Sequence, residues 1–165
     1  MQSLNGGAMD DSAALTKTQT TPKAKQRFFD CEDKTVFDSK NQLIWLKNDT
    51  WQMTGKWMNW VQSRDYALEL NRQQFAGYTN WRLPTPAEAK SLYDKSRGSK
   101  DYTGKTSWLH PIFPEGYSFL CWTSEVKNKV QGVRFGYRKG GIMFDNIYRL
   151  SRGATRFVRS REKNV

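Results

Sequence analysis

Few residues in this chain could perform catalytic chemistry, and their spacing matches no catalytic or metal-binding pattern. The chain contains two cysteines, Cys31 and Cys121, and one histidine, His110. A reactive thiolate needs a nearby cation to lower its pKa, whereas Cys31 is flanked by acidic residues. Zinc sites gather Cys and His at short spacing, and the sequence has no such cluster. We therefore expect no catalytic residue, no metal site and no cofactor, and a structural role for His110.

The second chemical feature is a local surplus of positive charge. The formal net charge is +11, and residues 126–165 contain eleven Lys and Arg residues against Asp145 and Glu162. Guanidinium groups bind sulfate, carboxylate or phosphate in bidentate geometry. The bias predicts an anionic partner, namely an acidic or sulfated glycan, an acidic protein, a phospholipid surface or nucleic acid. The alternative is a solvated basic face that only aids solubility.

An alternating strand is predicted to position these basic residues. The pattern places Val133 and Phe135 on one face and Arg134 and Arg138 on the other. If the second face is exposed, its arginines form a basic ridge with the residues of the following turn. The candidate polyanion-binding residues are Arg134, Arg138, Lys139, Arg149 and Arg152.

A segment rich in large apolar residues, 51–60, precedes the first predicted long helix. It could be a loop packed over the core, which is the commoner fate of tryptophan. It could also be an exposed platform for a sugar face or a protein partner. The candidate partner-contact residues are Trp51, Met53, Trp57 and Tyr137.

The elements that position these residues are readable from local signals. Two β-rich runs at 35–38 and 43–46, separated by a polar turn, predict a hairpin. Apolar residues at three- and four-residue spacing predict a helix over 60–74. A second helix is expected to begin at Pro86 and to stop before Gly98, and a loop is expected over 96–118.

Three further strands are predicted in the second half of the chain. They cover 119–124, 130–138 and 142–148, and the Gly140-Gly141 pair makes a hairpin turn between the last two. A closing strand is predicted over 155–159.

The segment between the two predicted helices carries explicit stop and start signals. Gly77 suits the left-handed residue after a helix end. Thr85 can cap the next helix, with Pro86 in its first turn and Glu88 completing a capping box. The predicted structural clasp consists of Trp81, Arg82, Thr85 and Glu88.

This segment, 77–88, is named the hinge. It resembles the signature of the Lcl C-terminal-like domain family, which is named for the C-terminal domain of the Legionella collagen-like adhesin. The resemblance runs from about Phe28 to Arg159, through the opening hairpin, the hinge and a strand around Trp122. The closing strand departs from the pattern, because Phe157 replaces the usual cysteine. The family's disulfide therefore cannot be transferred, and the pairing of the two cysteines stays open.

The resemblance implies an α+β, C-type-lectin-like fold, in which two helices pack on a small twisted antiparallel sheet with long loops. It implies a domain over 27–165. Residues 1–26 are polar and lack aromatics, and we expect them to form a flexible N-terminal tail. The related formylglycine-generating enzymes share the hinge motif. The two cysteines do not match the flanking pattern of their copper-binding pair, so we expect no oxidase activity and no enzyme.

The resemblance also implies a function: a non-enzymatic binding module that recognises polyanionic, sulfated glycans or another acidic partner at the bacterial cell envelope. Arg82, Arg156 and Arg159 occupy motif positions and are expected to be structural. The alternative is an accessory subunit docked on a larger protein complex through its aromatic loop and N-terminal tail. Nucleic acid is less favoured, because no recognised module supports it beyond charge.

The expected location is the periplasm or the cell surface. The sequence shows no signal peptide and no segment apolar enough to span a membrane, so a cytoplasmic location stays open. The sequence does not identify the ligand or the oligomeric state.

Overall fold

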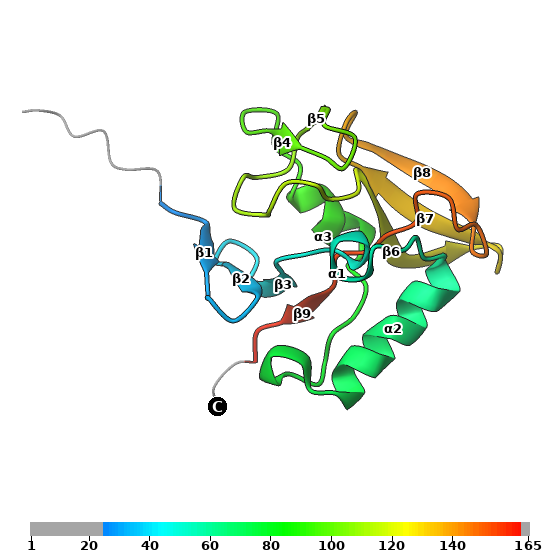
Figure 1. Ribbon diagram of the computed structural model, residues 1–165, viewed down its shortest axis with the longest axis horizontal. Helices are drawn as coiled ribbons and strands as arrows, with labels where there is room; N and C mark the ends of the chain where they lie inside the picture. Colours follow the sequence, from blue (N-terminus) through cyan, green and yellow to red (C-terminus); the bar gives the residue numbers. More distant parts are fainter. Residues whose placement is uncertain (1–24, 163–165) are drawn as a thin grey trace, which may run out of the picture.

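The computed structural model describes residues 25–162 (Figure 1). The tail expected over 1–26 lies almost wholly outside these residues. The helices are α1 (Thr50–Thr54), α2 (Trp60–Arg72) and α3 (Pro86–Ser91), with a 3-10 turn η1 (Phe75–Gly77). The strands are β1 (Phe28–Asp30), β2 (Thr35–Asp38), β3 (Leu43–Leu46), β4 (Ser99–Lys100), β5 (Thr106–Ser107), β6 (Leu120–Lys127), β7 (Gln131–Gly136), β8 (Gly141–Asn146) and β9 (Val158–Ser160).

The strands form three antiparallel sheets rather than the single small sheet expected. Their orders are β1-β2-β3-β9, β4-β5 and β6-β7-β8. The predicted hairpins β2–β3 and β7–β8 are both present, and the closing strand β9 returns to pair with β3. The mixed α+β class is therefore correct. The expected loop over 96–118 contains the short pair β4–β5.

Strand β6 separates two parts of the core, because successive side chains point to opposite faces. Cys121 packs in one cluster with Leu92 and Phe135. Trp122 packs in the other with Ala67 and Leu70 of α2 and with aromatic residues of the hinge. Strand β7 is consequently covered on both faces, and its arginine, Arg134, is buried.

The helices are shorter than predicted, and one was not predicted. Helix α2 ends at Arg72, because Gln74 and Ala76 take left-handed backbone angles. Helix α3 ends at Ser91, and Tyr93 then bridges to Leu109.

Helix α1 occupies part of the segment expected as a loop. Asp49 and Gln52 form a capping box at its start, and left-handed Gly55 ends it.

The hinge residues lie together and join distant parts of the chain. The Arg82 guanidinium donates to both carboxylate oxygens of Glu88, at 2.6 and 2.9 Å. Thr85 and Glu88 cap α3 reciprocally. Trp81 is buried, and its indole N–H donates to the carbonyl of Phe75. This arrangement fixes the path from α2 to α3.

Candidate functional site

Arg134 does not lie on an exposed ridge, contrary to the expectation from strand alternation. Its side chain is only 1% exposed, and its guanidinium carbon lies 3.7 Å from the Trp122 ring centroid. Asp145 is 3.4 Å away, and the Ser151 carbonyl accepts a hydrogen bond. Burial lowers the Arg134 pKa to about 10, so the side chain remains charged at neutral pH. Arg134 therefore belongs to the interior of the domain.

Arg138 is held at the edge of the core. Its Nε donates to Asp101 at 2.9 Å, and its Nη2 donates to Thr103 at 2.6 Å. The guanidinium also lies 3.8 Å from the ring centroid of Phe119. Asp101 is buried, which raises its pKa, but hydrogen bonds from Arg138, Thr103 and Ser107 outweigh burial and leave that pKa below the usual value. The charge of Arg138 is thus neutralised by a local carboxylate.

The remaining three basic candidates are exposed. Arg149 pairs with Asp145 at 2.6 Å. Within the described part of the chain, Lys139 and Arg152 form no ion pair, and Arg152 lies 5.9 Å from the Phe119 ring centroid. Of the five candidate residues, these two therefore carry the positive charge that is available to a ligand.

The segment that carries Arg152 lies against the aromatic loop. The Met58 N–H donates to the Gly153 carbonyl at 2.7 Å. A side chain at Gly153 would collide with the Met58 carbonyl, since a Cβ there would lie 1.9 Å from that oxygen. Two regions that the sequence singled out separately are therefore side by side.

An aromatic cluster continues from Phe119 toward this loop. Phe119 stacks with Tyr102 at 5.9 Å between ring centroids, and Tyr102 meets Trp57 edge-on at 4.9 Å. Trp57 stacks on Trp51 at 3.9 Å. Trp51, Trp57 and Tyr102 are each half-buried. We name the arginine–aromatic surface after its members, which are Trp51, Trp57, Tyr102, Arg138 and Arg152.

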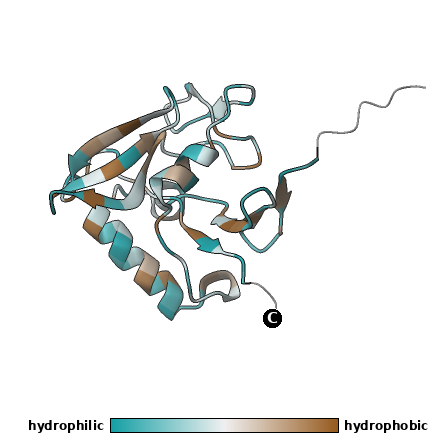
Figure 2. Ribbon diagram, turned by 180° about the vertical axis from the view of Figure 1, so that it is seen from behind, coloured by the Kyte–Doolittle hydropathy of each residue, from teal (hydrophilic) through white to brown (hydrophobic). Residues whose placement is uncertain are grey.

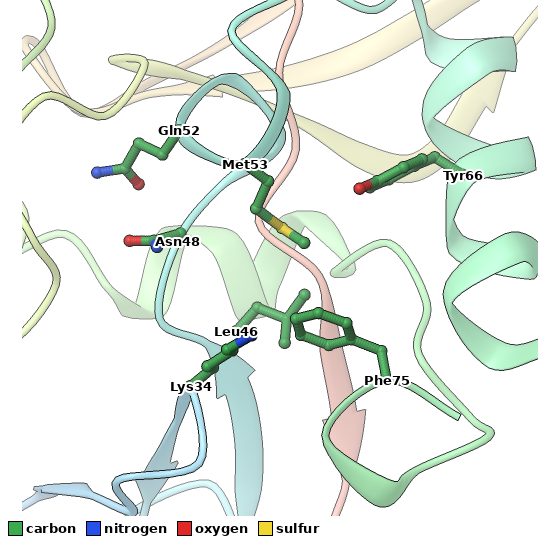
Figure 3. Close-up of a pocket in the computed structure, with 7 residues that line it drawn as sticks. All are labelled: Lys34, Leu46, Asn48, Gln52, Met53, Tyr66 and Phe75. Carbon is green, nitrogen blue, oxygen red and sulfur yellow. The ribbon is translucent and has the colours of Figure 1, made fainter. Parts of the chain in front are cut away.

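Two of the predicted contact residues lie elsewhere. Tyr137 is buried, and its hydroxyl donates to the Ala89 carbonyl, so it cannot meet a partner. Met53 points into a separate pocket of about 440 Å3 (Figure 3). The sequence did not indicate Tyr102 or Phe119 as members of this cluster. Tyr102 lies in an expected loop, and Phe119 begins the strand predicted over 119–124, where nothing in the sequence shows its aromatic neighbours.

The pocket that contains Met53 combines apolar walls with a polar rim. It is lined by Lys34, Leu46, Asn48, Gln52, Met53, Tyr66 and Phe75 (Figure 3). The Lys34 ammonium lies 5.4 Å from the Phe75 ring centroid. Gln52 has a structural role, because its amide donates to the carbonyls of Pro114 and Glu115. This pocket could take an apolar group, but it does not adjoin the arginines discussed above.

The cysteines and the histidine are not gathered into a reactive site. Cys31 is exposed and Cys121 is buried, and both are free thiols. Burial raises the pKa of Cys121 to about 11, which disfavours the thiolate. The Nδ1 atom of His110 accepts a hydrogen bond from the Ile112 N–H. Within residues 25–162, no group of three or more His, Cys, Asp or Glu residues could hold a metal ion.

The family comparison covers most of this architecture. A family model described as the Lcl C-terminal domain matches residues 34–159. The chain belongs to this family. The Lcl C-terminal domain match confirms the resemblance and includes every member of the arginine–aromatic surface. No curated protein and no solved structure matches the chain. None of the helices in the described part of the chain is long and apolar enough to cross a membrane.

Proposed function

We propose that this Lcl C-terminal domain is a non-catalytic binding module for sulfated or otherwise acidic glycans at the bacterial cell envelope. One observation carries the proposal: Arg138 and Arg152 converge on Phe119 beside the half-buried Trp51, Trp57 and Tyr102. The family relation to an adhesin supports a cell-surface role. A C-type-lectin-like fold, which the family resemblance implies, is part of the same proposal.

The two kinds of side chain suit the two parts of an acidic sugar. The rings can stack on the apolar face of a sugar, while guanidinium and ammonium groups bind sulfate or carboxylate. Arg152 and Lys139 supply the unneutralised charge, since Arg138 is paired with Asp101. A purely electrostatic surface would need no exposed ring, and a purely apolar one would need no free cation.

Binding to immobilised heparin tests this proposal. The double variant Arg152→Ala/Lys139→Ala should elute at clearly lower salt and bind a heparin oligosaccharide about tenfold more weakly, which is about 1.4 kcal/mol. The matched control, Lys40→Ala/Lys90→Ala, also removes two exposed charges that form no ion pair among the described residues, and it should elute close to the wild type. Equal losses in the two double variants would mean that retention follows net charge alone, and the proposed surface would be wrong.

The accessory-subunit alternative needs a different kind of surface. The aromatic loop is only half-exposed, so it presents a limited area to a protein partner. A larger exposed apolar area lies on β8, and it is considered separately below.

A further inference from the structure

The outermost strand β8 carries an unusual concentration of exposed apolar side chains. Its residues Ile142, Met143 and Phe144, with Tyr148 and Leu150 just beyond it, are 43–66% exposed. These are five of the eight large hydrophobic residues that are exposed in the described part of the chain. Figure 2 shows hydrophobic colour along this outer strand. Contiguous exposed apolar residues commonly mark an interaction site.

Strand β8 is also an open edge. The sheet order is β6-β7-β8, so one side of β8 pairs with β7 (Figure 1). The carbonyl of Asn146, at the end of β8, accepts a backbone hydrogen bond from Arg149. Among the described residues, no backbone hydrogen bond from outside the sheet reaches 141–145. Unpaired N–H and C=O groups along such an edge can accept a further strand.

Natural edge strands usually carry features that prevent such pairing. Proline, lysine or a bulge within the strand are common examples. β8 contains none of these within 141–146. Its one charged residue, Asp145, forms ion pairs with Arg134 and Arg149 of the same chain. The edge is therefore chemically open to a strand with apolar side chains.

Lysines stand at both ends of this edge. Lys139 lies in the turn that leads into β8, and Lys129 lies in the turn beside its far end, where Gln131 pairs with Asn146. Lys127 also approaches, with its ammonium 5.4 Å from the Phe144 ring centroid. Lys129 and Lys139 form no ion pair within residues 25–162. A partner that carries acidic residues on both sides of an apolar strand complements this pattern.

A second copy of the chain is a poorer match. An antiparallel pair of β8 strands would bring the Lys139 end of one copy against the Lys129 end of the other. The net charge of +11 adds further repulsion between copies. Charge therefore favours a different, acidic partner.

We propose that β8 is a docking edge for an extended segment of another protein, which adds as a fourth strand and carries alternating apolar residues flanked by acidic residues. The main-chain hydrogen bonds supply affinity, and the side chains of Ile142, Met143 and Phe144 supply specificity. The β8 edge and the proposed glycan site share only Lys139, so the two proposals can be tested independently.

Selection of random dodecapeptides displayed on phage, against the full chain, tests the proposal. The enriched peptides should have an apolar residue at every second position, as an extended strand requires, and Asp or Glu at both ends. Resynthesised peptides should bind Phe144→Asp at least about tenfold more weakly than wild type. The control Leu68→Asp alters another exposed apolar residue, on α2, and should bind as wild type does. Hydrogen exchange should slow in 141–146 when a peptide is bound.

Three results would overturn the proposal. They are a selection that enriches no peptide, enriched peptides without acidic ends, and binding that Phe144→Asp leaves intact. Sedimentation velocity adds a further test. If the wild type is a dimer and Phe144→Asp is a monomer, a second copy covers β8 and the proposal is wrong. Heparin retention of Phe144→Asp should stay at the wild-type value, so failure here is distinguishable from failure of the glycan proposal.

Discussion

Arg134 and Arg152 belong to the same basic quarter of the chain, but they lie in opposite environments. Arg134 is buried on the Trp122 ring and lies 3.4 Å from Asp145. Arg152 is exposed beside Phe119, and no carboxylate among the described residues pairs with it. The comparison teaches that net charge overstates the charge available to a ligand. Burial and a local carboxylate decide whether a guanidinium stabilises the fold or serves binding.

Other arginines extend the buried group. Arg156 is buried and donates to the carbonyls of Leu46 and Lys47. Arg159 lies 3.8 Å from the Tyr78 ring centroid and donates to Asn80. Much of the basic C-terminal region is thus structural.

The largest expected effect is the loss of stability when the buried member of the comparison is removed. Arg134→Ala would leave Asp145 without this partner and open a space beside Trp122. We expect a loss of about 3 kcal/mol in the free energy of unfolding, measured by urea denaturation. The exposed control Arg64→Ala should change it by less than about 0.5 kcal/mol. Similar values for the two variants would remove the distinction between the groups.

The second prediction concerns Arg138, whose charge is neutralised in the wild type and would become available to a ligand in a variant. Asp101→Asn removes the carboxylate that neutralises Arg138. We expect unfolding to become easier by about 2 kcal/mol, because a buried charged hydrogen bond is lost. Heparin retention should increase at the same time, since Arg138 gains an unneutralised charge. A variant that loses stability without binding heparin more tightly would show that Arg138 does not face the ligand.

The third prediction concerns the hinge and its dependence on pH. Burial of Glu88 raises its pKa, but hydrogen bonds from Arg82 and Thr85 outweigh burial and place that pKa below the usual value. Between the lowered folded-state pKa and the unfolded value of about 4.3, the unfolded chain therefore binds more protons than the folded one, and stability falls as the pH falls through this window. Glu88→Ala should cost about 1–2 kcal/mol at pH 7.

Urea denaturation of wild type and Glu88→Ala at several pH values measures this difference. The gap between the two proteins should narrow as the solution is acidified toward the folded-state pKa of Glu88. A constant gap would mean that the ionised form of the Glu88 carboxylate contributes nothing to stability, through either Arg82 or the cap of α3.

The smallest expected effect is that of pH on glycan binding. Arginine and lysine stay charged between about pH 5 and 8. The one histidine, His110, has a pKa lowered by burial, and its ring packs on Phe28 at 5.0 Å. Heparin affinity should therefore be nearly constant across this range, as measured by calorimetry. A steep loss above pH 6 would point to a protonated histidine in the site.

The sequence predicted the parts of the fold that depend on local signals. Turn residues predicted the hairpins at 35–46 and around Gly140, and capping residues predicted the helix start at Thr85. Helix α1 could have been found too, from Asp49 and Gln52 at capping-box spacing.

The environment of Arg134 could not be predicted, because it depends on elements distant in sequence. Alternation along β7 showed which residues share a face, but not that Trp122 and the segment around Ser151 cover Arg134. Tyr102 and Phe119 were missed for the same reason, because their role arises from contacts between segments far apart in the chain.

The contrast between heparin and inorganic polyphosphate tests the central claim most directly. Both are polyanions, but only heparin has sugar rings that can stack on Trp57 and its neighbours. Trp57→Ala, checked for folding by thermal denaturation, should bind heparin several-fold more weakly, by about 1 kcal/mol, and bind polyphosphate as wild type does. Equal affinity of Trp57→Ala and wild type for heparin, or an equal loss for both polymers, would contradict glycan recognition by the arginine–aromatic surface.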